Sequence, residues 1–368
     1  MDESKIPTTT VQLIRHPGQT NQFARDYRWL RNLGSGHDGE CSRWLSRHPS
    51  YRTVVAKIGL AEDIQNEVEL LYQLKPFRHN RIVELLGLYT DIPEKGDRIL
   101  LLEDCRCDLW KYKEIALHPT EFHRLREPIL LRFFKELTEA VAFLHYGHGT
   151  QHYLSTDPRN KWTPIIHRDI KCENILMRPS LTHPHDPTMD TIVLADFGFA
   201  GEYRRNNEKF KGGTFDYQPP EWVKNESSTP AADVWAVGAC IHFLILSEAP
   251  VVRTRGYTSG MGRRETMKNM PRRVQKVLGA RISEDMSKVT APYTEELARP
   301  LDMALAMKRN GRATARGLLE YFGLAEKSDV PDVLAPKEEV SIFRRFQMKR
   351  SRKVITGQGR KRNGSGAS

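Results

Sequence analysis

The pattern of hydrophobic and polar positions changes character partway along the chain. From Tyr27 to about Leu102, short apolar runs alternate with turn residues, which is typical of strands; the runs at 52–58 and 99–102 are the clearest. Between these two runs, apolar residues recur at helical spacing over 64–74. The first part of the chain is therefore predicted to form a small lobe of strands with one helix.

The second part of the chain has a helical pattern from Pro128 onward, with one apolar face over 130–144. Further helices are expected over 232–246, 295–307 and 313–322. Together the two parts predict a two-lobed α+β fold, with a small β-rich N-lobe over 27–104 and a larger helical C-lobe over 105–324.

Polar segments flank and interrupt this plan. Residues 1–26 are expected to form a flexible arm, and residues 325–368 a basic, disordered tail. Two inserts, at 147–164 and 178–190, are rich in Pro, His, Thr and Asp. Segments of this composition are typical of surface loops.

The net charge of +11 is concentrated at one end of the chain. Nine Lys and Arg residues and no acidic residue lie between Ser341 and Ser368, which leaves the rest of the protein nearly neutral. Such a tail fits a nuclear import signal, or contact with nucleic acid or an anionic membrane surface. A solubilising tail without any partner explains the same charges, so its role stays open.

The sequence shows no segment that would direct the chain into a membrane. Residues 1–10 lack the apolar core of a secretory signal. The longest apolar run, Val234–Leu246, has 13 residues, whereas a bilayer span needs about 20. The five cysteines have no paired spacing, which favours free thiols in a reducing compartment. We therefore expect a cytoplasmic and/or nuclear protein without a transmembrane segment.

A glycine-rich segment at 33–41 is the first candidate for nucleotide binding. Gly34, Gly36 and Gly39 would let backbone N–H groups approach phosphate oxygens. Such turns also join strands without any ligand, so the segment alone is a weak signal. A dinucleotide-binding fold would need a helix directly after the third glycine, and a strand-like run follows here instead. That context favours a hairpin folded over a nucleotide.

Two charged residues follow the glycine segment at suggestive positions. Lys57 ends the apolar run 54–57, and Glu67 lies on the helix predicted after it. An ion pair between them would hold the lysine ammonium against the α- and β-phosphates of a nucleotide. Each residue alone is an ordinary charge, and only the combination with the glycine segment gives the pair meaning.

The segment from His167 to Asn174 carries the strongest signal. It concentrates an acid, an ammonium and an amide in one short turn. Asp169 is suited to orient a hydroxyl group and accept its proton, Lys171 to neutralise a transferring phosphoryl group, and Asn174 to hold a metal ion. Farther along, Asp196 follows an apolar run within an Asp-Phe-Gly turn, where its carboxylate can bind Mg²⁺.

In this order, these segments resemble the eukaryotic protein kinase family from about Tyr27 to Leu324, and the general pattern is similar to that of lineage-specific fungal kinases. Three later segments extend the resemblance: Pro219-Pro220-Glu221, Asp233-Val234-Trp235 with Gly238, and Asn310 to Thr314. The resemblance implies a buried ion pair between Glu221 and Arg312. It also implies ATP and Mg²⁺ as cofactors, and Lys171 together with Thr214 matches the serine/threonine branch.

The resemblance further implies a set of site residues. The catalytic residues expected are Lys57, Glu67, Asp169 and Lys171, and the Mg²⁺ ligands are Asn174 and Asp196. The hinge, whose backbone would bind adenine, is Glu103-Asp104-Cys105, preceded by Leu102 as gatekeeper. The other ATP contacts expected are Leu33, Gly34, Ser35, Gly36, Gly39, Cys41, Ala56, Lys57 and Leu176.

The segment between Gly198 and Pro219 has no phosphoacceptor in its centre, over 204–213. In the family, Arg168 would normally receive an activating phosphate. We hypothesise that Glu202 or Glu208 partly fills that place, which would make activity independent of phosphorylation in this loop. A solvated Arg168 is an equally good interpretation.

Other classes of protein share parts of this pattern. A pseudokinase scaffold would lack the Lys, Asp or Asn of the catalytic set, and none is missing here. A small-molecule kinase shares the Asp…Asn…Asp core but usually lacks the set of Glu221, Asp233 and Arg312. A nucleic-acid-binding role would rest on the tail alone. We therefore predict a kinase that transfers the γ-phosphoryl group of ATP to serine or threonine in protein substrates.

Overall fold

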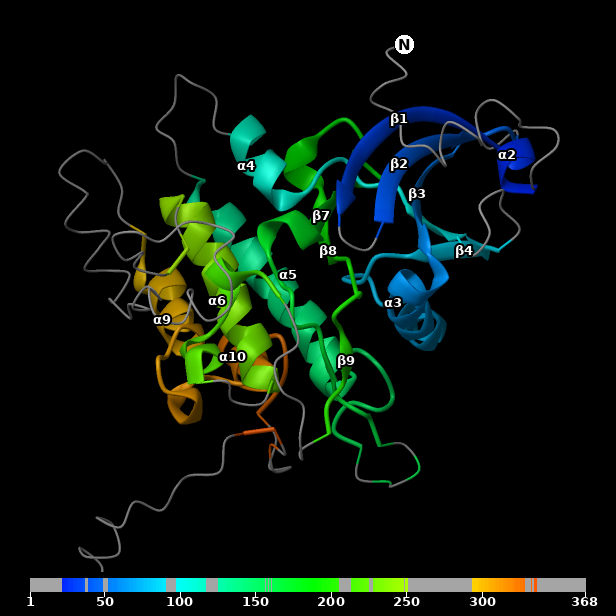
Figure 1. Ribbon diagram of the computed structural model, residues 1–368. Coiled ribbons are helices and arrows are strands. Elements are labelled where there is room, and N and C mark those ends of the chain that lie inside the picture. The colour runs from blue at the N-terminus through cyan, green and yellow to red at the C-terminus, as the bar shows by residue number, and fades with distance from the viewer. Residues whose placement is uncertain are drawn as a thin grey trace, which may run out of the picture.

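The computed structural model consists of two lobes, one built on a sheet and one on helices (Figure 1). The described residues are 22–36, 39–48, 52–90, 97–116, 125–155, 157, 159, 161–204, 213–224, 228–247, 249–250, 293–327, 332 and 334–335. The two-lobed α+β fold predicted from the hydrophobic pattern is confirmed.

The first lobe is built on a five-stranded antiparallel sheet with the strand order β1-β2-β3-β5-β4. Its strands are β1 (Tyr27–Gly36), β2 (Gly39–Ser46), β3 (Thr53–Leu60), β4 (Leu85–Tyr89) and β5 (Asp97–Glu103). β1 and β2 form a hairpin in which Gly36 pairs with Gly39. One helix, α3 (Ala61–Leu74), packs against β3 and β5 and buries Ile64, Val68 and Leu71. The helix predicted over 64–74 is therefore confirmed.

The sheet has two buried faces because side chains alternate along each strand. The inner face carries Leu100 and Leu102, which belong to the same core as the helices of the second lobe. The outer face is covered by the short helix α2 (Gln22–Asp26), whose fully buried Phe23 packs edge-on against Trp44. Residues 22–26, which the sequence placed in a flexible arm, are thus held on the sheet by one aromatic side chain.

The second lobe is centred on α5 (Glu127–Tyr146) and α6 (Pro230–Leu246). Helix α6 is buried around its whole circumference, as expected for an apolar core helix. Gly238 allows α9 (Glu295–Ala304) to approach α6, because a Cβ at that position would lie 2.9 Å from Leu305. Among the described residues, the other α-helices of this lobe are α4 (Leu109–Ala116) and α10 (Ala315–Tyr321).

Two short sheets bring the functional loops together. β6 (Ile165–Ile166) pairs with β9 (Gly201–Glu202), and β7 (Ile175–Arg178) pairs with β8 (Thr191–Leu194). Figure 1 shows β7 and β8 between the five-stranded sheet and α5. The turn that follows β8 therefore lies where the two lobes meet (Figure 1).

The inserts are anchored to the body by long-range contacts. In the first, the indole N–H of Trp162 donates to the carbonyl of Leu144 at 2.8 Å, and its ring lies against Phe77. In the second, the buried carboxylate of Asp190 accepts a hydrogen bond from Arg106 at 2.5 Å. Leu181 in the second insert is 94% exposed, as predicted for a surface loop.

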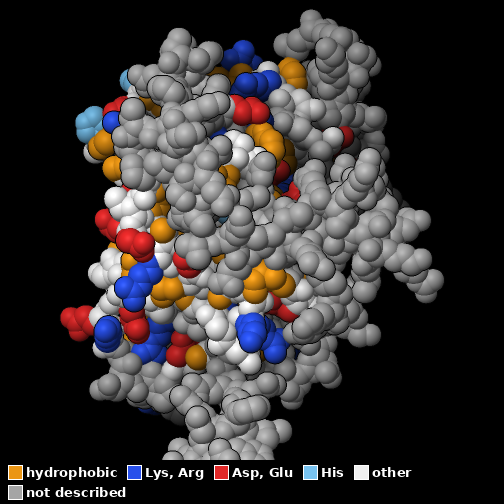
Figure 2. Space-filling view, turned by 90° about the vertical axis from the view of Figure 1, so that its left-hand side faces the viewer, with side chains coloured by type: hydrophobic (Ala, Val, Ile, Leu, Met, Phe, Trp, Pro, Cys, Tyr) orange, Lys and Arg blue, Asp and Glu red, His pale blue; other side chains and the backbone are white. Residues whose placement is uncertain are grey.

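The described surface mixes charges of both signs. On the face shown in Figure 2, acidic and basic side chains lie close to one another with hydrophobic ones between them. Among the described residues, no helix is long and apolar enough to cross a membrane. Most of the predicted basic tail lies outside the described residues, but Asp332 accepts hydrogen bonds from Tyr146 and Thr314. Described residues beyond Leu324 therefore also contact the second lobe.

Candidate functional site

The pairing of the strands determines which side chains share the inner face with Lys57. Cys41 is the partner of Lys57 on β2, and Leu100 is its partner on β5; paired residues of an antiparallel sheet project to the same side. Val55 packs against the core on this side, whereas Ala56 belongs to the outer core. The assignment of Ala56 to the ATP site was therefore wrong, because adjacent strand residues point in opposite directions. Val55 is the residue that lies on the same face as Lys57.

Lys57 forms two ion pairs on the inner face. Its Nζ lies 2.6 Å from Oε2 of Glu67 and 3.0 Å from Oδ1 of Asp196. Burial alone lowers the pKa of Lys57, but the two carboxylates outweigh burial and raise it, so the ammonium is charged. Burial raises the pKa of Glu67, and the Lys57 ammonium opposes that effect. The ion pair predicted between Lys57 and Glu67 is thus present.

The Asp-Phe-Gly turn is attached to helix α3. Glu67 accepts a hydrogen bond from the N–H of Phe197 at 3.1 Å, and the phenyl ring of Phe197 is fully buried. Asp196 has a φ of 63°, in the left-handed region that non-glycine residues avoid. Burial alone raises the pKa of Asp196, but Lys57 outweighs burial and lowers it, so the carboxylate is ionised.

Asn66 gives this turn a second attachment that sequence reasoning missed. Its Nδ2 lies 3.2 Å from the carbonyl of Phe197 and 2.9 Å from those of Gly198 and Ala200. The segment between Gly198 and Pro219 is the activation segment. Asn66 therefore holds the start of the activation segment and is the chain neighbour of Glu67, which pairs with Lys57. A polar residue next to Glu67 is too ordinary a signal to be recognised in a sequence.

The segment from His167 to Asn174 is held by Asp233 at the start of α6. Its carboxylate accepts from the N–H of His167 at 2.8 Å and of Arg168 at 3.0 Å, and lies 3.0 Å from Nε2 of His145. Burial alone raises the pKa of Asp233, but the hydrogen bond and charge of His145 outweigh it and lower the pKa. These contacts hold Arg168 at a φ of 71°, a conformation that costs about 1–3 kcal/mol for a non-glycine residue.

The Asp169 carboxylate is fixed by donors on both oxygens. Oδ2 lies 2.9 Å from Nζ of Lys171 and 3.2 Å from Nδ2 of Asn174. Oδ1 accepts from the backbone N–H of Thr214 at 2.7 Å and from its hydroxyl at 2.8 Å. The structure therefore brings the predicted residues Asp169, Lys171 and Asn174 into one network, together with Thr214 from the far end of the activation segment.

Arg168, expected to receive a phosphate or its substitute, donates to the carbonyl of Phe199 at 3.0 Å. Glu202 forms an exposed ion pair with Arg204 at 3.2 Å. Glu208, the other residue named in the hypothesis, lies outside the described residues. The described contacts thus tie Arg168 to the backbone of the activation segment.

The glycine hairpin needs glycine at one position for steric reasons. Gly39 has a φ of 135°, and a Cβ there would lie 2.4 Å from the carbonyl oxygen of Ile58. The other predicted contacts in this hairpin occupy the end of β1 and the start of β2: Leu33, Gly34, Ser35, Gly36 and Cys41. Burial is the main effect that raises the pKa of Cys41, to about 11, so its thiol is neutral beside Lys57.

The hinge follows β5 and is held by two arginines. Arg178 donates to the carboxylate of Glu103 at 2.7 Å, and Arg43 donates to the carboxylate of Asp104 at 2.9 Å. Among the described residues, none accepts a hydrogen bond from the N–H of Cys105. Burial raises the pKa of the Cys105 thiol, so that it too is neutral.

The two remaining predicted ATP contacts border the hinge. Leu102 pairs with Val55 across the sheet, so both project to the inner face. Leu176 forms a bridge with Asp108, which follows the hinge. Both positions are consistent with contact to a base bound at the hinge.

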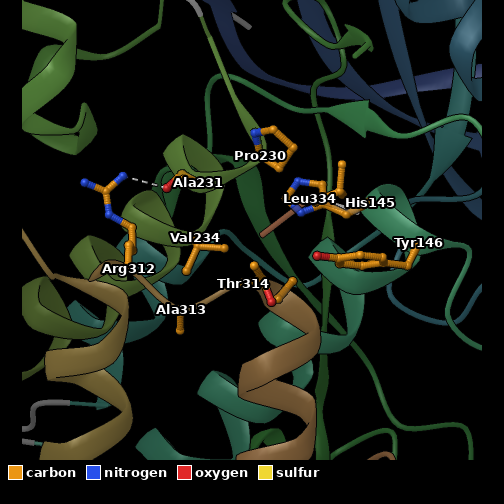
Figure 3. A pocket seen from close by; sticks show the side chains of 10 residues that line it. His145, Tyr146, Pro230, Ala231, Val234, Arg312, Ala313, Thr314 and Leu334 are labelled. Atoms are coloured by element: carbon orange, nitrogen blue, oxygen red, sulfur yellow. Dashed lines mark hydrogen bonds between the residues drawn. The ribbon is translucent and has the colours of Figure 1, made fainter. Parts of the chain in front are cut away.

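The ion pair predicted between Glu221 and Arg312 is confirmed. Nη1 and Nη2 of Arg312 donate to the two carboxylate oxygens at 2.6 and 2.9 Å, and both side chains are buried. Nη1 also donates to the carbonyl of Ala231 (Figure 3). Arg312 lines a small pocket with His145, Tyr146 and Thr314, but none of the predicted catalytic residues lies there.

Comparison with known proteins agrees with this geometry. Residues 27–322 match the family described as Protein kinase domain. The chain belongs to this family. It is accordingly an ATP-dependent protein kinase of the serine/threonine type.

Relatives of this kinase include several Aurora kinases. It is 27% identical to Aurora kinase B of Drosophila melanogaster over 66% of this chain and 67% of the relative. It is 24% identical to Aurora kinase A-B of Xenopus laevis over 88% of this chain and 68% of the relative. It is also 27% identical to Sucrose non-fermenting protein kinase 1 of Fusarium virguliforme, over 63% of this chain and 29% of the relative.

Proposed function

We propose that this kinase transfers the γ-phosphoryl group of ATP to serine or threonine hydroxyls of protein substrates, with Asp169 as the catalytic base. The observation that supports this role most is a hydrogen bond from a threonine hydroxyl of the same chain to the Asp169 carboxylate. The hydroxyl of Thr214 donates to Oδ1 of Asp169 at 2.8 Å, which is the contact that a substrate hydroxyl needs before it loses its proton.

Lys171 assists at the same carboxylate. Its ammonium lies 2.9 Å from Asp169 and 3.1 Å from the hydroxyl of Thr214. A positive charge here opposes the negative charge that accumulates near the acceptor hydroxyl. Lys171 therefore orients the base and stabilises the transferring group.

The residues proposed to hold Mg²⁺ fit that ion chemically. Mg²⁺ prefers oxygen ligands, and the Asp196 carboxylate is ionised beside Lys57. Asn174 donates through Nδ2 to the backbone oxygen of Asp169 at 2.9 Å, which leaves its Oδ1 to act as a ligand. When bound, ATP supplies the phosphoryl group and Mg²⁺ neutralises part of its charge.

The nucleotide itself is proposed to lie between the glycine hairpin and the hinge. Lys57, oriented by Glu67, would hold the α- and β-phosphates. The N–H of Cys105, without an acceptor among the described residues, would donate to N1 of adenine, and the backbone carbonyl of Glu103 would accept from its amino group. Val55 and Leu176 would contact the faces of the base.

The substitution Asp169→Asn tests the proposed base. It is expected to lower kcat by about 10²–10⁴-fold while nucleotide binding is retained, because a neutral amide cannot take a proton. Asp157→Asn is the control, since Asp157 lies in the first insert and pairs with the exposed Arg159. Phosphopeptide formation by the Asp169→Asn enzyme at the wild-type rate would refute the assignment.

The activation and partners of the enzyme are also proposals. Attachment of residues 197–200 to Asn66 and Arg168 supports activity without loop phosphorylation, since the segment is anchored by uncharged carbonyls. A nuclear import function of the tail, and its contact with nucleic acid or an anionic membrane, stay predictions from its charge. So does a cytoplasmic and/or nuclear location.

A further inference from the structure

Arg43 connects the glycine hairpin to the hinge. It lies on β2 opposite Val55, so it shares the inner face with Cys41 and Lys57. Its guanidinium contacts the hinge through two nitrogens. Nε lies 2.9 Å and Nη2 2.7 Å from Oδ1 of Asp104, and Nη2 donates to the carbonyl of Cys105 at 2.9 Å.

These contacts form in a largely desolvated place. The side chains of Arg43 and Asp104 are only 17% and 13% exposed, so water competes weakly for the guanidinium. A hydrogen bond from a charged donor is stronger than one from a neutral donor. The carbonyl of Cys105 is therefore engaged by a cation before any nucleotide enters.

The engaged carbonyl belongs to the same residue whose N–H has no described acceptor. The hinge thus presents one open donor, the N–H of Cys105, beside one occupied acceptor, its carbonyl. A carbonyl oxygen can accept two hydrogen bonds, but a guanidinium already bound withdraws electron density from it and crowds one side. The second acceptor position of the hinge is accordingly weakened.

This pattern distinguishes the two purine bases. Adenine offers an acceptor at N1 and a donor at its amino group, which match the N–H of Cys105 and the carbonyl of Glu103. Guanine carries the opposite pattern on the same edge, an acceptor at O6 and a donor at N1–H. To bind, guanine must shift along the hinge so that O6 meets the N–H of Cys105 and N1–H meets its carbonyl. That is the acceptor which Arg43 occupies.

We propose that Arg43 is a specificity-determining residue that makes the hinge select adenine over guanine nucleotides. The inference rests on the proposed binding of the base at the hinge. Arg43 selects the base by donating a hydrogen bond to the carbonyl of Cys105 and by holding Asp104 in place. It contacts neither the phosphates nor the acceptor hydroxyl in the proposed complex.

The experiment compares wild type with Arg43→Met, which keeps the length of the side chain but has no donor. The ratio of kcat/KM for ATP over GTP is expected to fall by about tenfold, the effect of one hydrogen bond to a charged group. The change should appear in KM rather than kcat, because Arg43 is remote from Asp169. Arg43→Lys, which can still donate to the carbonyl of Cys105, is expected to recover part of the preference.

Arg31→Met is the matched control. Arg31 is the partner of Arg43 on the neighbouring strand β1 and is exposed, so its loss should leave the ratio unchanged. An unchanged ratio in Arg43→Met, or an equal change in Arg31→Met, would overturn the inference. If Arg43→Met does not fold, Arg43→Leu, which also has no donor, takes its place. A reduced ratio in Arg43→Leu supports the inference, and a wild-type ratio overturns it.

Binding measurements separate this inference from the proposed function. Displacement of a fluorescent adenine nucleotide by ADP and by GDP reports base selection without any phosphoryl transfer. If the wild type transfers no phosphate, the proposed function is contradicted. If the wild type prefers ADP and Arg43→Met does not, the role of Arg43 is supported even then. Equal affinity of the wild type for ADP and GDP would overturn the role of Arg43 whatever the catalytic activity.

Discussion

The ion pair between Arg312 and Glu221 offers the sharpest test of what holds the second lobe together. Arg312 is 3% exposed and Glu221 5% exposed. Besides its two bonds to Glu221, Arg312 donates to the carbonyls of Ala231 at 2.8 Å and Ala306 at 3.2 Å. One side chain therefore joins the segment before α6, the first turn of α6 and the loop after α9.

The substitution Arg312→Met keeps the apolar stem and removes every donor. Glu221 is then left as a buried carboxylate without its partner, which costs about 3–5 kcal/mol. The two orphaned carbonyls belong to the same desolvated place, so their cost overlaps with this figure and is not added to it. We expect the free energy of unfolding to fall by about 3–5 kcal/mol.

Equilibrium unfolding in urea measures this loss as a lower midpoint at an unchanged slope. The double variant Glu221→Leu with Arg312→Met removes both charges and should recover most of the loss, because the cost lies in the unpaired charge. Lys308→Met, at an exposed position after α9, is the control and should change stability by less than about 0.5 kcal/mol. The reasoning fails if Arg312→Met costs no more than this control, or if the double variant is no more stable than Arg312→Met.

Two further predictions concern backbone geometry and pH. Gly213 has a φ of 92°, and a Cβ there would lie 2.6 Å from the carbonyl oxygen of Arg168. Gly213→Ala should lower kcat about a hundredfold, because it displaces the segment from His167 to Asn174. In the control Gly311→Ala a Cβ meets open space, so kcat should keep its wild-type value. Burial lowers the pKa of His79 to about 4, with help from the positive charges around it. The neutral ring is then the stable form in the fold, so stability is complete above a pH of about 6.5 and falls as the pH drops towards 4. His79→Phe, which keeps the stacking on Phe143, should reduce this loss by up to about 1.4 kcal/mol per pH unit; thermal unfolding between pH 7 and 5 measures it, and parallel curves for the two proteins would contradict it.

The fold was largely predictable because its elements carry their own signals. The helical spacing over 64–74 and the apolar run that became α6 needed no knowledge of the rest of the chain. The grouping of Asp169, Lys171 and Asn174 in one network was predictable for the same reason, since the three residues lie within one short turn. Spacing along the chain is enough to predict such a group when its residues are close in sequence.

Residues that act across the fold could not be found in this way. Asn66 reaches carbonyls more than 130 positions away, and Arg43 reaches a hinge 61 positions away. Neither has an unusual neighbourhood in the sequence, so only the pairing of strands and helices reveals the contact. The error at Ala56 was different, because the alternation of strand residues already contained the answer: Val55, two positions before Lys57, must share its face.

The two strained residues of the site, Arg168 and Asp196, also bear on how such a fold changes over time. Both have positive φ, and both belong to segments proposed to act on the nucleotide or the acceptor. Replacement of Asp196 by glycine would remove a proposed Mg²⁺ ligand and would also relax the backbone, so a single substitution would lower activity and relieve strain together. Selection for catalytic activity therefore retains these side chains, because selection for stability alone would favour glycine at both positions. Inactive descendants that serve only as scaffolds are accordingly an easily reached outcome for this architecture.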